Sequence, residues 1–157
     1  ININEVINFV LEDLSEKIKE SNAEIIAEDM PVLIGRSNDL RMLFQNLIHN
    51  ALKFKSSNKI PRITIRSVKV PSFFQFSVED NGIGIAKNQQ DNIFNAFHKL
   101  HNHAKFEGSG IGLYGSKKII DHHQGQIWVE SEEQKGSKFH FTISTNLIEH
   151  NTIEDSI

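Results

Sequence analysis

The spacing of hydrophobic residues predicts a helix at the start of the chain. Apolar residues recur there at intervals of three and four, which is typical of an amphipathic helix over about 4 to 21. The residues of this apolar series are Ile3, Val6, Ile7, Val10, Leu11, Leu14 and Ile18. The segment 23–27 is short and partly β-branched, so a strand is expected there before Pro31 breaks the chain.

A second helix and a hairpin are predicted next. Ser37 or one of the two residues after it can cap this helix, which runs to about Lys55. Beyond a polar loop, apolar residues alternate over 62–69 and again over 74–78. A Pro-Ser pair lies between the two alternating segments, so they are expected to form a hairpin.

The second half of the chain begins with a predicted turn that leads into a short helix, over about 80–97. Residues 98–109 are polar and have no periodicity, which predicts a long loop. Gly110 or Gly112 then opens another helix, which ends near His123.

The chain closes with a strand pair. Gly125 is a candidate C-cap for the preceding helix, and the strands are expected over 126–131 and 138–144. Helices in two blocks with mostly antiparallel strands indicate an α+β fold, a two-layer α/β sandwich with helices on one face of the sheet. We expect one compact domain over 1–145 and a polar tail or linker over 146–157.

Composition narrows the function classes. The chain has 157 residues and a net charge of only -3, and it has no long basic run, so a nucleic-acid surface is not expected. It has no cysteine, which excludes disulfides and thiolate chemistry. No apolar run reaches the roughly 20 residues that a membrane helix needs, so no membrane contact is expected from this piece. It does not begin with methionine, so we expect it to be part of a longer protein.

The segment QNLIHNALKFK, residues 45–55, carries a polar stripe on its predicted helix. Relative to Asn46, Asn50 lies at about +40° and Lys53 at about -20° around the helix axis, away from the apolar stripe. Amide oxygens are ligands that suit magnesium, and a lysine one turn further can neutralise phosphate. The alternative is a solvated polar face.

Two glycine-rich segments offer complementary chemistry. In DNGIGI, Asp80 follows a strand and can accept from an exocyclic amine, although a simple strand exit explains the glycines equally well. In GSGIGL, three glycines at alternate positions can direct backbone N–H groups to an anion at a helix N-terminus. The spacing matches neither the dinucleotide fingerprint nor a Walker loop. Together with the amide and lysine stripe, these segments supply groups suited to the magnesium ion, the phosphates and the adenine of ATP–Mg²⁺.

Four segments in this order resemble the motif boxes of a known family. QNLIHNALKF is similar to the N box, DNGIGI to the G1 box, IFNAFHKL to the F box and GSGIGLYGSKKII to the G2 box. The chain therefore resembles the catalytic and ATP-binding domain of sensor histidine kinases, whose superfamily includes gyrase, heat-shock chaperone and mismatch-repair ATPases. NEVINFVLEDLSEKI is similar to the opening helix of that domain, and IWVESEEQKGSKFHFTI to its closing hairpin. The resemblance implies the Bergerat-type fold.

The resemblance also implies roles for single residues. Asn50 would hold Mg²⁺, Lys53 would reach phosphate, and Asn46 would lie beside the phosphates. Phe54 would border the nucleotide. Asp80 would accept from the adenine amine, partly through water.

Further implied contacts lie in the second half of the chain. Ser137 would share the water at the adenine amine, and Gly82 and Gly84 would let the chain pass the base. The loop 98–107 would be the mobile ATP lid, with Lys99 approaching the γ-phosphate. Gly108, Gly110 and Gly112 would wrap the triphosphate, and Ser109 and Leu113 would also belong to the ATP-binding site.

The first asparagine of the N box separates the branches of the superfamily. Hydrolytic members use a glutamate there as general base, and Asn46 cannot take that proton, so phosphotransfer is favoured. None of the eight histidines precedes an acidic residue, so the acceptor histidine is expected on a dimerisation domain upstream. The implied partners are that domain and a response regulator receiver domain, and the implied location is cytoplasmic. A hydrolytic member and a degenerate binding module remain the alternatives.

Some features stay open at the level of sequence. The sequence suggests either a metal site or a solvated lid at His98, His101 and His103. The lid is favoured because the chain has no cysteine and no regular secondary structure is predicted around these histidines. His49 is either a general base near the phosphates or a surface histidine. Trp128 belongs either to the core or to a partner surface. The F box also departs from the family pattern at residues 95–96, where Asn-Ala replaces an acidic residue and proline.

Overall fold

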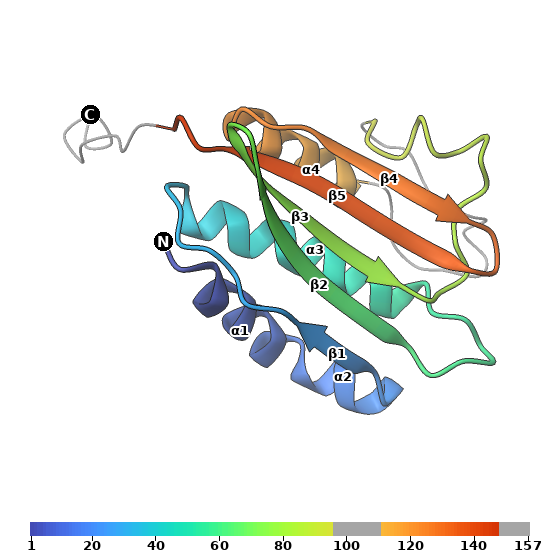
Figure 1. The fold of residues 1–157 in the computed structure, drawn as a ribbon. Helices are drawn as coiled ribbons and strands as arrows, with labels where there is room; N and C mark the ends of the chain where they lie inside the picture. The colour runs from blue at the N-terminus through green and yellow to red at the C-terminus, as the bar shows by residue number, and fades with distance from the viewer. Residues whose placement is uncertain (96–110, 148–157) are drawn as a thin grey trace.

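Five strands form one mixed sheet in the computed structural model, which describes residues 1–95 and 111–147. The strands are β1 (Glu24–Ala27), β2 (Arg62–Val70), β3 (Phe73–Asp80), β4 (Ile127–Glu132) and β5 (Gly136–Ser144). Their order across the sheet is β1-β2-β3-β5-β4 (Figure 1). Only β1 and β2 pair in parallel, and the other neighbours are antiparallel. The predicted hairpins are therefore confirmed.

The helices cover one face of this sheet. They are α1 (Ile3–Asp13), α2 (Ser15–Ser21), α3 (Ser37–Lys53) and α4 (Ile111–His122). Figure 1 shows α1, α3 and α4 behind the sheet, with α3 in the middle of the helical layer. The α+β two-layer sandwich predicted from the sequence is confirmed.

Aromatic rings join the two layers at the centre of the core. Phe76 on β3 and Phe141 on β5 are register partners whose rings stack with 5.0 Å between centroids. Phe44 on α3 meets them edge-on, at 6.0 Å from Phe76 and 5.4 Å from Phe141. All three side chains are fully buried. This contact fixes α3 against the sheet, and α3 carries the predicted polar stripe.

The single helix predicted over 4–21 is divided at Leu14. That residue has φ -95° and ψ 9°, and it separates α1 from α2. The break is shallow, because Leu14 N–H still donates to Val10 O and Leu14 O still accepts from Ile18 N–H. Leu14 stays in the core while α2 contributes no buried residue. Hydrophobic spacing cannot detect a one-residue bend that leaves the periodicity intact.

The predicted cap of α3 was wrong. Ser37 is already helical and Arg36 occupies the N-cap position, where its side chain makes no capping hydrogen bond. The N–H of Arg36 donates instead to Nε2 of His123, at 3.1 Å. The start of α3 is thus held by the end of α4, a long-range contact that a local capping rule cannot anticipate.

The short helix predicted after DNGIGI is also absent as far as residue 95. Residues 86–95 form successive turns with i to i+3 hydrogen bonds, such as Gln89 N to Ala86 O and Asn92 N to Gln89 O. Asparagine competes with helical backbone bonding, and the Nδ2 group of Asn95 donates to Oδ1 of Asn92. Ile93 is buried and anchors these turns to the core.

The end of α4 differs from its prediction in one detail. Gln124, with φ +56°, adopts the left-handed conformation one residue before Gly125, the predicted C-cap. The N–H of Gly125 donates to Ile120 O, which closes the helix. A Cβ on Gly125 would lie 1.7 Å from Thr142 O, so glycine is needed there because β5 passes close by.

Candidate functional site

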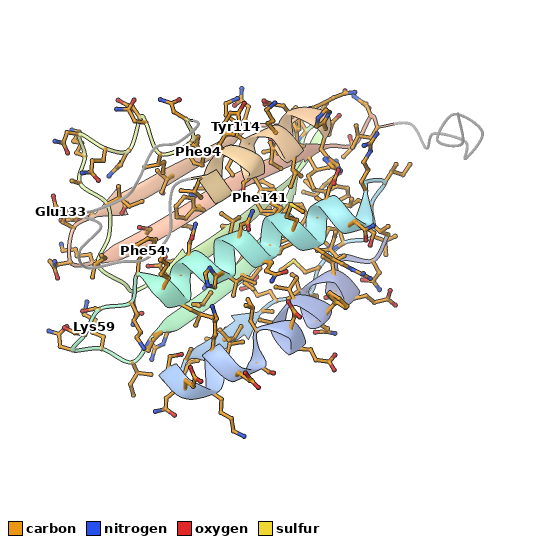
Figure 2. All side chains as sticks on the ribbon, turned by 180° about the vertical axis from the view of Figure 1, so that it is seen from behind. Phe54, Lys59, Phe94, Tyr114, Glu133 and Phe141 are labelled. Atoms are coloured by element: carbon orange, nitrogen blue, oxygen red, sulfur yellow. The ribbon has the colours of Figure 1, made fainter. Side chains whose placement is uncertain are left out.

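A pocket lies where the end of α3 meets the ends of the central strands. Its lining comes from α3, from the loop after β3 and from the start of β5, and consists of Asn50, Ala51, Phe54, Asp80, Gly84, Ile85, Ser137 and Phe139. Figure 2 views the molecule from the helical side and shows Phe54 at the C-terminal end of α3. Five residues predicted for the site, from three separate segments, therefore meet around one space. The pocket combines apolar walls with a few polar groups, as small-molecule sites do.

The polar stripe of α3 forms one side of this region. Asn46, Asn50 and Lys53 are each half-buried, whereas the apolar stripe of the same helix is buried in the core. Nζ of Lys53 lies 5.3 Å from the ring centroid of Phe54, a cation–π contact next to the pocket. Asn50 lines the pocket, and the oxygen of its side-chain amide is a hard neutral ligand of the kind that magnesium accepts.

Asp80 supplies the carboxylate of the pocket. Its Oδ1 accepts from the backbone N–H groups of Gly82 at 2.9 Å and of Ser137 at 3.3 Å. Both backbone donors that reach this carboxylate within residues 1–95 and 111–147 use Oδ1, so the acceptor capacity of Oδ2 remains for a ligand. Burial raises the pKa of Asp80 to about 6, against the opposing effect of the two hydrogen bonds. Asp80 is therefore mainly ionised at neutral pH.

Two predicted glycines hold the loop after β3 in place. A Cβ on Gly82 would lie 2.4 Å from Phe54 O, and one on Gly84 would lie 2.1 Å from Glu132 O. Gly84 also has φ +71°, which disfavours any side chain. In addition, Ile83 N–H donates to Phe54 O. Close packing of the protein backbone is thus sufficient to require glycine at both positions, whatever passes beside them.

Two residues of the site were not identified from the sequence. Ser131 on β4 accepts from Ile85 N–H at 2.8 Å and lies 2.7 Å from Ser137 Oγ. Gln90 donates through Nε2 to Ile85 O at 2.9 Å and to Ser131 O at 3.0 Å. Neither residue belongs to a motif box or lines the pocket itself. Strand pairing places Ser131 against the lining residue Ser137, and Gln90 joins them through its hydrogen bonds to Ile85 and Ser131.

A basic cluster lies on the other side of the polar stripe. Nζ of Lys17 on α2 lies 2.8 Å from Nε2 of His49, which makes His49 the acceptor of the ammonium proton. Burial lowers the pKa of His49, and the positive charges of Lys17 and Lys53 lower it further. His49 is thus held neutral beside two cations.

The remaining predicted residues fall into two groups. Lys99, Gly108, Ser109 and Gly110, together with the three lid histidines, lie outside the described residues. Gly112 lies in the first turn of α4, and the side chain of Leu113 is buried in the core. Within residues 1–95 and 111–147, no group of three or more His, Cys, Asp or Glu side chains could hold a metal ion. The lid residues therefore stay predictions.

Trp128 lies on the sheet face opposite the helices. Its indole stacks on the imidazole of its register partner His140, with 5.1 Å between ring centroids. The residues on either side of it, Ile127 and Val129, pack against the core. Trp128 is therefore half-buried on the outer face and takes no part in the pocket.

Comparison with known proteins places this chain in a family. The model of the histidine kinase-, DNA gyrase B- and HSP90-like ATPase family matches residues 35–147. The chain belongs to this family. The similar relatives include the adaptive-response sensory kinase SasA, and the similar solved structures include the catalytic domain of the histidine kinase ThkA, so the chain is a catalytic domain of the histidine kinase type.

Two similar relatives are longer proteins of Synechocystis sp.. The phytochrome-like protein Cph1 of Synechocystis sp. is 42% identical over 141 residues, which are 90% of this chain and 19% of Cph1. The adaptive-response sensory kinase SasA of Synechocystis sp. is 35% identical over 138 residues, covering 85% of this chain and 36% of SasA. The chain thus spans about a fifth of the length of Cph1 and about a third of that of SasA.

Solved structures agree with the relatives. The catalytic domain of the histidine kinase ThkA superposes with a TM-score of 0.78 and 28% identity, covering 92% of this chain and 93% of that domain. ThkA in complex with the response regulator protein TrrA gives a TM-score of 0.74 and 26% identity, with 93% of this chain and 41% of that chain covered. The match to a nearly complete catalytic domain confirms the resemblance that the four boxes indicated.

Within residues 1–95 and 111–147, no helix is both long enough and apolar enough to cross a membrane.

Proposed function

We propose that this chain binds ATP–Mg²⁺ in the pocket at the end of α3 and donates the γ-phosphoryl group to a histidine on a separate dimerisation domain. The observation that carries this proposal is the convergence of Asn50, Phe54 and Asp80 around one pocket. These residues come from distant parts of the sequence, and each has the chemistry that one part of the nucleotide requires. The match to histidine kinases over most of the chain supports the same proposal.

Each residue is assigned a part of the nucleotide. Asp80 Oδ2 accepts from the exocyclic amine of adenine, and Phe54 lies against the nucleotide at the pocket wall. Lys53 reaches toward the phosphates, with Asn46 beside them. Asn50 fits as a protein ligand of magnesium, since it lines the pocket and carries an amide oxygen, and phosphate oxygens and water can complete the shell. The bound ion supplies neutralisation of phosphate charge.

Transfer is favoured over hydrolysis by the side chain at position 46. Asparagine has no titrating group that could take a proton from water, so it cannot act as the general base of a hydrolase. In the proposed transfer, the bond between the γ-phosphorus and the bridging oxygen breaks, a histidine nitrogen forms a new bond to that phosphorus, and ADP leaves. A response regulator would then receive the group, and we place this chemistry in the cytoplasm.

The test is a calorimetric titration of the chain with ATP in the presence and absence of Mg²⁺. Magnesium-dependent binding is expected, and its absence would overturn the proposal. Asn50→Ala should abolish the magnesium dependence while leaving the thermal unfolding curve in place. Asn38→Ala is the matched control, because Asn38 is an exposed asparagine on the same helix. Rapid hydrolysis of ATP by the isolated chain would instead favour a hydrolytic enzyme.

A further inference from the structure

The hydroxyl of Ser131 has three hydrogen-bonding contacts, and they use its whole capacity. Its oxygen lies 2.8 Å from Ile85 N, 2.9 Å from Gly136 O and 2.7 Å from Ser137 Oγ. A serine hydroxyl has one proton and two lone pairs. The Ile85 N–H can only donate and the Gly136 carbonyl can only accept. Ser131 therefore gives its proton to Gly136 O and uses one lone pair for Ile85.

The third contact, between the hydroxyls of Ser131 and Ser137, can then be donated in only one direction. Because the proton of Ser131 is engaged by Gly136 O, the hydrogen bond between the two hydroxyls must be donated by Ser137. The proton of Ser137 consequently points toward Ser131 on the neighbouring strand. The lone pairs of Ser137 Oγ are what remains for the pocket, which Ser137 lines.

This orientation determines the chemistry at the end of the pocket. Ser137 is the register partner of Asp80, and its N–H already donates to Asp80 Oδ1. The side chains of both residues thus offer acceptors: Asp80 through Oδ2 and Ser137 through Oγ. An aminopurine presents N–H donors to such a pair, directly or through water. An oxopurine presents a carbonyl oxygen, which two acceptors repel.

We propose that Ser131 is a positioning residue that sets the pocket to select adenine over oxopurine nucleotides. It acts through Ser137, whose hydroxyl it holds as an acceptor. If Ser131 released that hydroxyl, Ser137 could donate to the O6 atom of hypoxanthine while Asp80 accepted from N1–H. The pocket would then suit inosine triphosphate. This inference rests on the proposed nucleotide function.

The experiment compares MgATP and MgITP binding by calorimetry in the wild-type chain and in Ser131→Ala. The substitution should reduce the ratio of ATP to ITP affinity about tenfold, which corresponds to the loss of one oriented hydrogen bond. Ser131→Thr keeps the hydroxyl and should restore the ratio. If Ser131→Ala fails to fold, Ser131→Cys replaces it, since a thiol fills similar space and accepts hydrogen bonds weakly.

A double-mutant cycle separates positioning from a general loss of structure. In a Ser137→Ala background there is no hydroxyl to turn, so Ser131→Ala should leave the ATP to ITP ratio unchanged. Equal weakening of both nucleotides by Ser131→Ala, or an effect on the ratio that persists without Ser137, would overturn the inference while ATP binding itself stood. Failure of the wild-type chain to bind either triphosphate would overturn the proposed function and this inference with it.

Discussion

The imidazole of His123 accepts a hydrogen bond from the backbone N–H of Arg36, with 3.1 Å between Nε2 and N. The other ring nitrogen, Nδ1, lies 2.7 Å from Ile119 O and donates to it. One nitrogen must donate and the other accept, so this contact requires a neutral imidazole of a single tautomer. His123 is 2% exposed. The ring thus joins the end of α4 to the start of α3, the helix that carries Asn46 and Asn50.

Replacing His123 should destabilise the domain. His123→Phe keeps an aromatic ring but leaves the Arg36 N–H without its partner and removes the ring's hydrogen bond to Ile119 O, which keeps only the bond from the backbone N–H of residue 123. This should cost about 2 to 4 kcal/mol of unfolding free energy. Urea denaturation measures this loss. The control is His122→Phe at the exposed neighbouring position, where a change within about 0.5 kcal/mol is expected. Equal effects at both positions would show that the buried contact is not what stabilises the helix junction.

Asp80→Asn should raise stability, with a defined pH dependence. The pKa of Asp80 is raised from 3.8 to about 6 by burial, so its ionisation opposes folding. Because the neutral carboxyl is favoured in the folded state, its contribution to the stability of the wild-type chain is fully present below the unfolded-state pKa of 3.8. That contribution is lost as the pH rises through the folded-state pKa of about 6. Relative to wild type, the variant should therefore gain up to about 3 kcal/mol between pH 4 and pH 7. Denaturation at each pH measures the gain.

This prediction is checked by a second carboxylate variant and by a measurement of nucleotide binding. Glu133→Gln removes an exposed carboxylate near the same strands and should show no comparable pH-dependent gain. The stabilised Asp80→Asn variant should also bind adenine nucleotides much more weakly, while free triphosphate is affected little. A variant that gained stability and kept its affinity for adenine nucleotides would show that Asp80 does not bind the adenine base.

The pKa of His49 should respond to Lys17. Lys17→Met removes a neighbouring positive charge, so the pKa of His49 should rise toward its ordinary value of 6.5. An NMR titration of the imidazole resonances measures the change. Lys19→Met removes an exposed lysine from the same short helix without this contact and should leave the His49 titration in place.

The same resonance can report where the phosphates lie. If ATP places its phosphates beside Lys53, their negative charge should raise the pKa of His49 in the wild-type chain. Adenosine, which has no phosphate, should produce a much smaller change. A titration of His49 that is indifferent to ATP at saturation would place the phosphates away from this end of α3.

Two glycines should respond to alanine in opposite directions. A Cβ on Gly115 meets nothing within 4 Å, and Gly115 lies inside α4, so Gly115→Ala should stabilise the domain by about 0.5 to 1 kcal/mol. Gly84 has φ +71° and its Cβ would meet Glu132 O, so Gly84→Ala should destabilise by about 2 kcal/mol or more. Thermal unfolding of the two variants tests this contrast. Stabilisation by Gly84→Ala would contradict the close packing of the loop after β3.

Local patterns were sufficient for much of this protein. The 3.6-residue spacing around Asn46, Asn50 and Lys53 located both α3 and its polar stripe, because a helix converts spacing directly into a face. Alternation located the β2–β3 hairpin for the same reason. The order of the four boxes was enough to indicate the family, since four ordered motifs rarely coincide by chance.

Other features depended on contacts between distant segments. The bend at Leu14 preserves the hydrophobic spacing, so the sequence pattern is the same with or without it. The turns over 86–95 follow from asparagine side chains and a buried Ile93, which compete successfully with a helical pattern. The N-terminus of α3 is held by His123, which lies 87 residues further along the chain.

The sequence by itself determined the fold class, the helix that presents the amide and lysine stripe, and the family, because each of these is written in spacing or in contiguous motifs. Only the tertiary structure decided that the N–H groups of Gly82 and Ser137 both reach Oδ1 of Asp80, that Gly82 and Gly84 are needed for packing, and that Ser131 orients Ser137. These properties depend on strand register and on the distances between backbones. Such quantities exist only after β3, β4 and β5 have paired and α3 has packed against them.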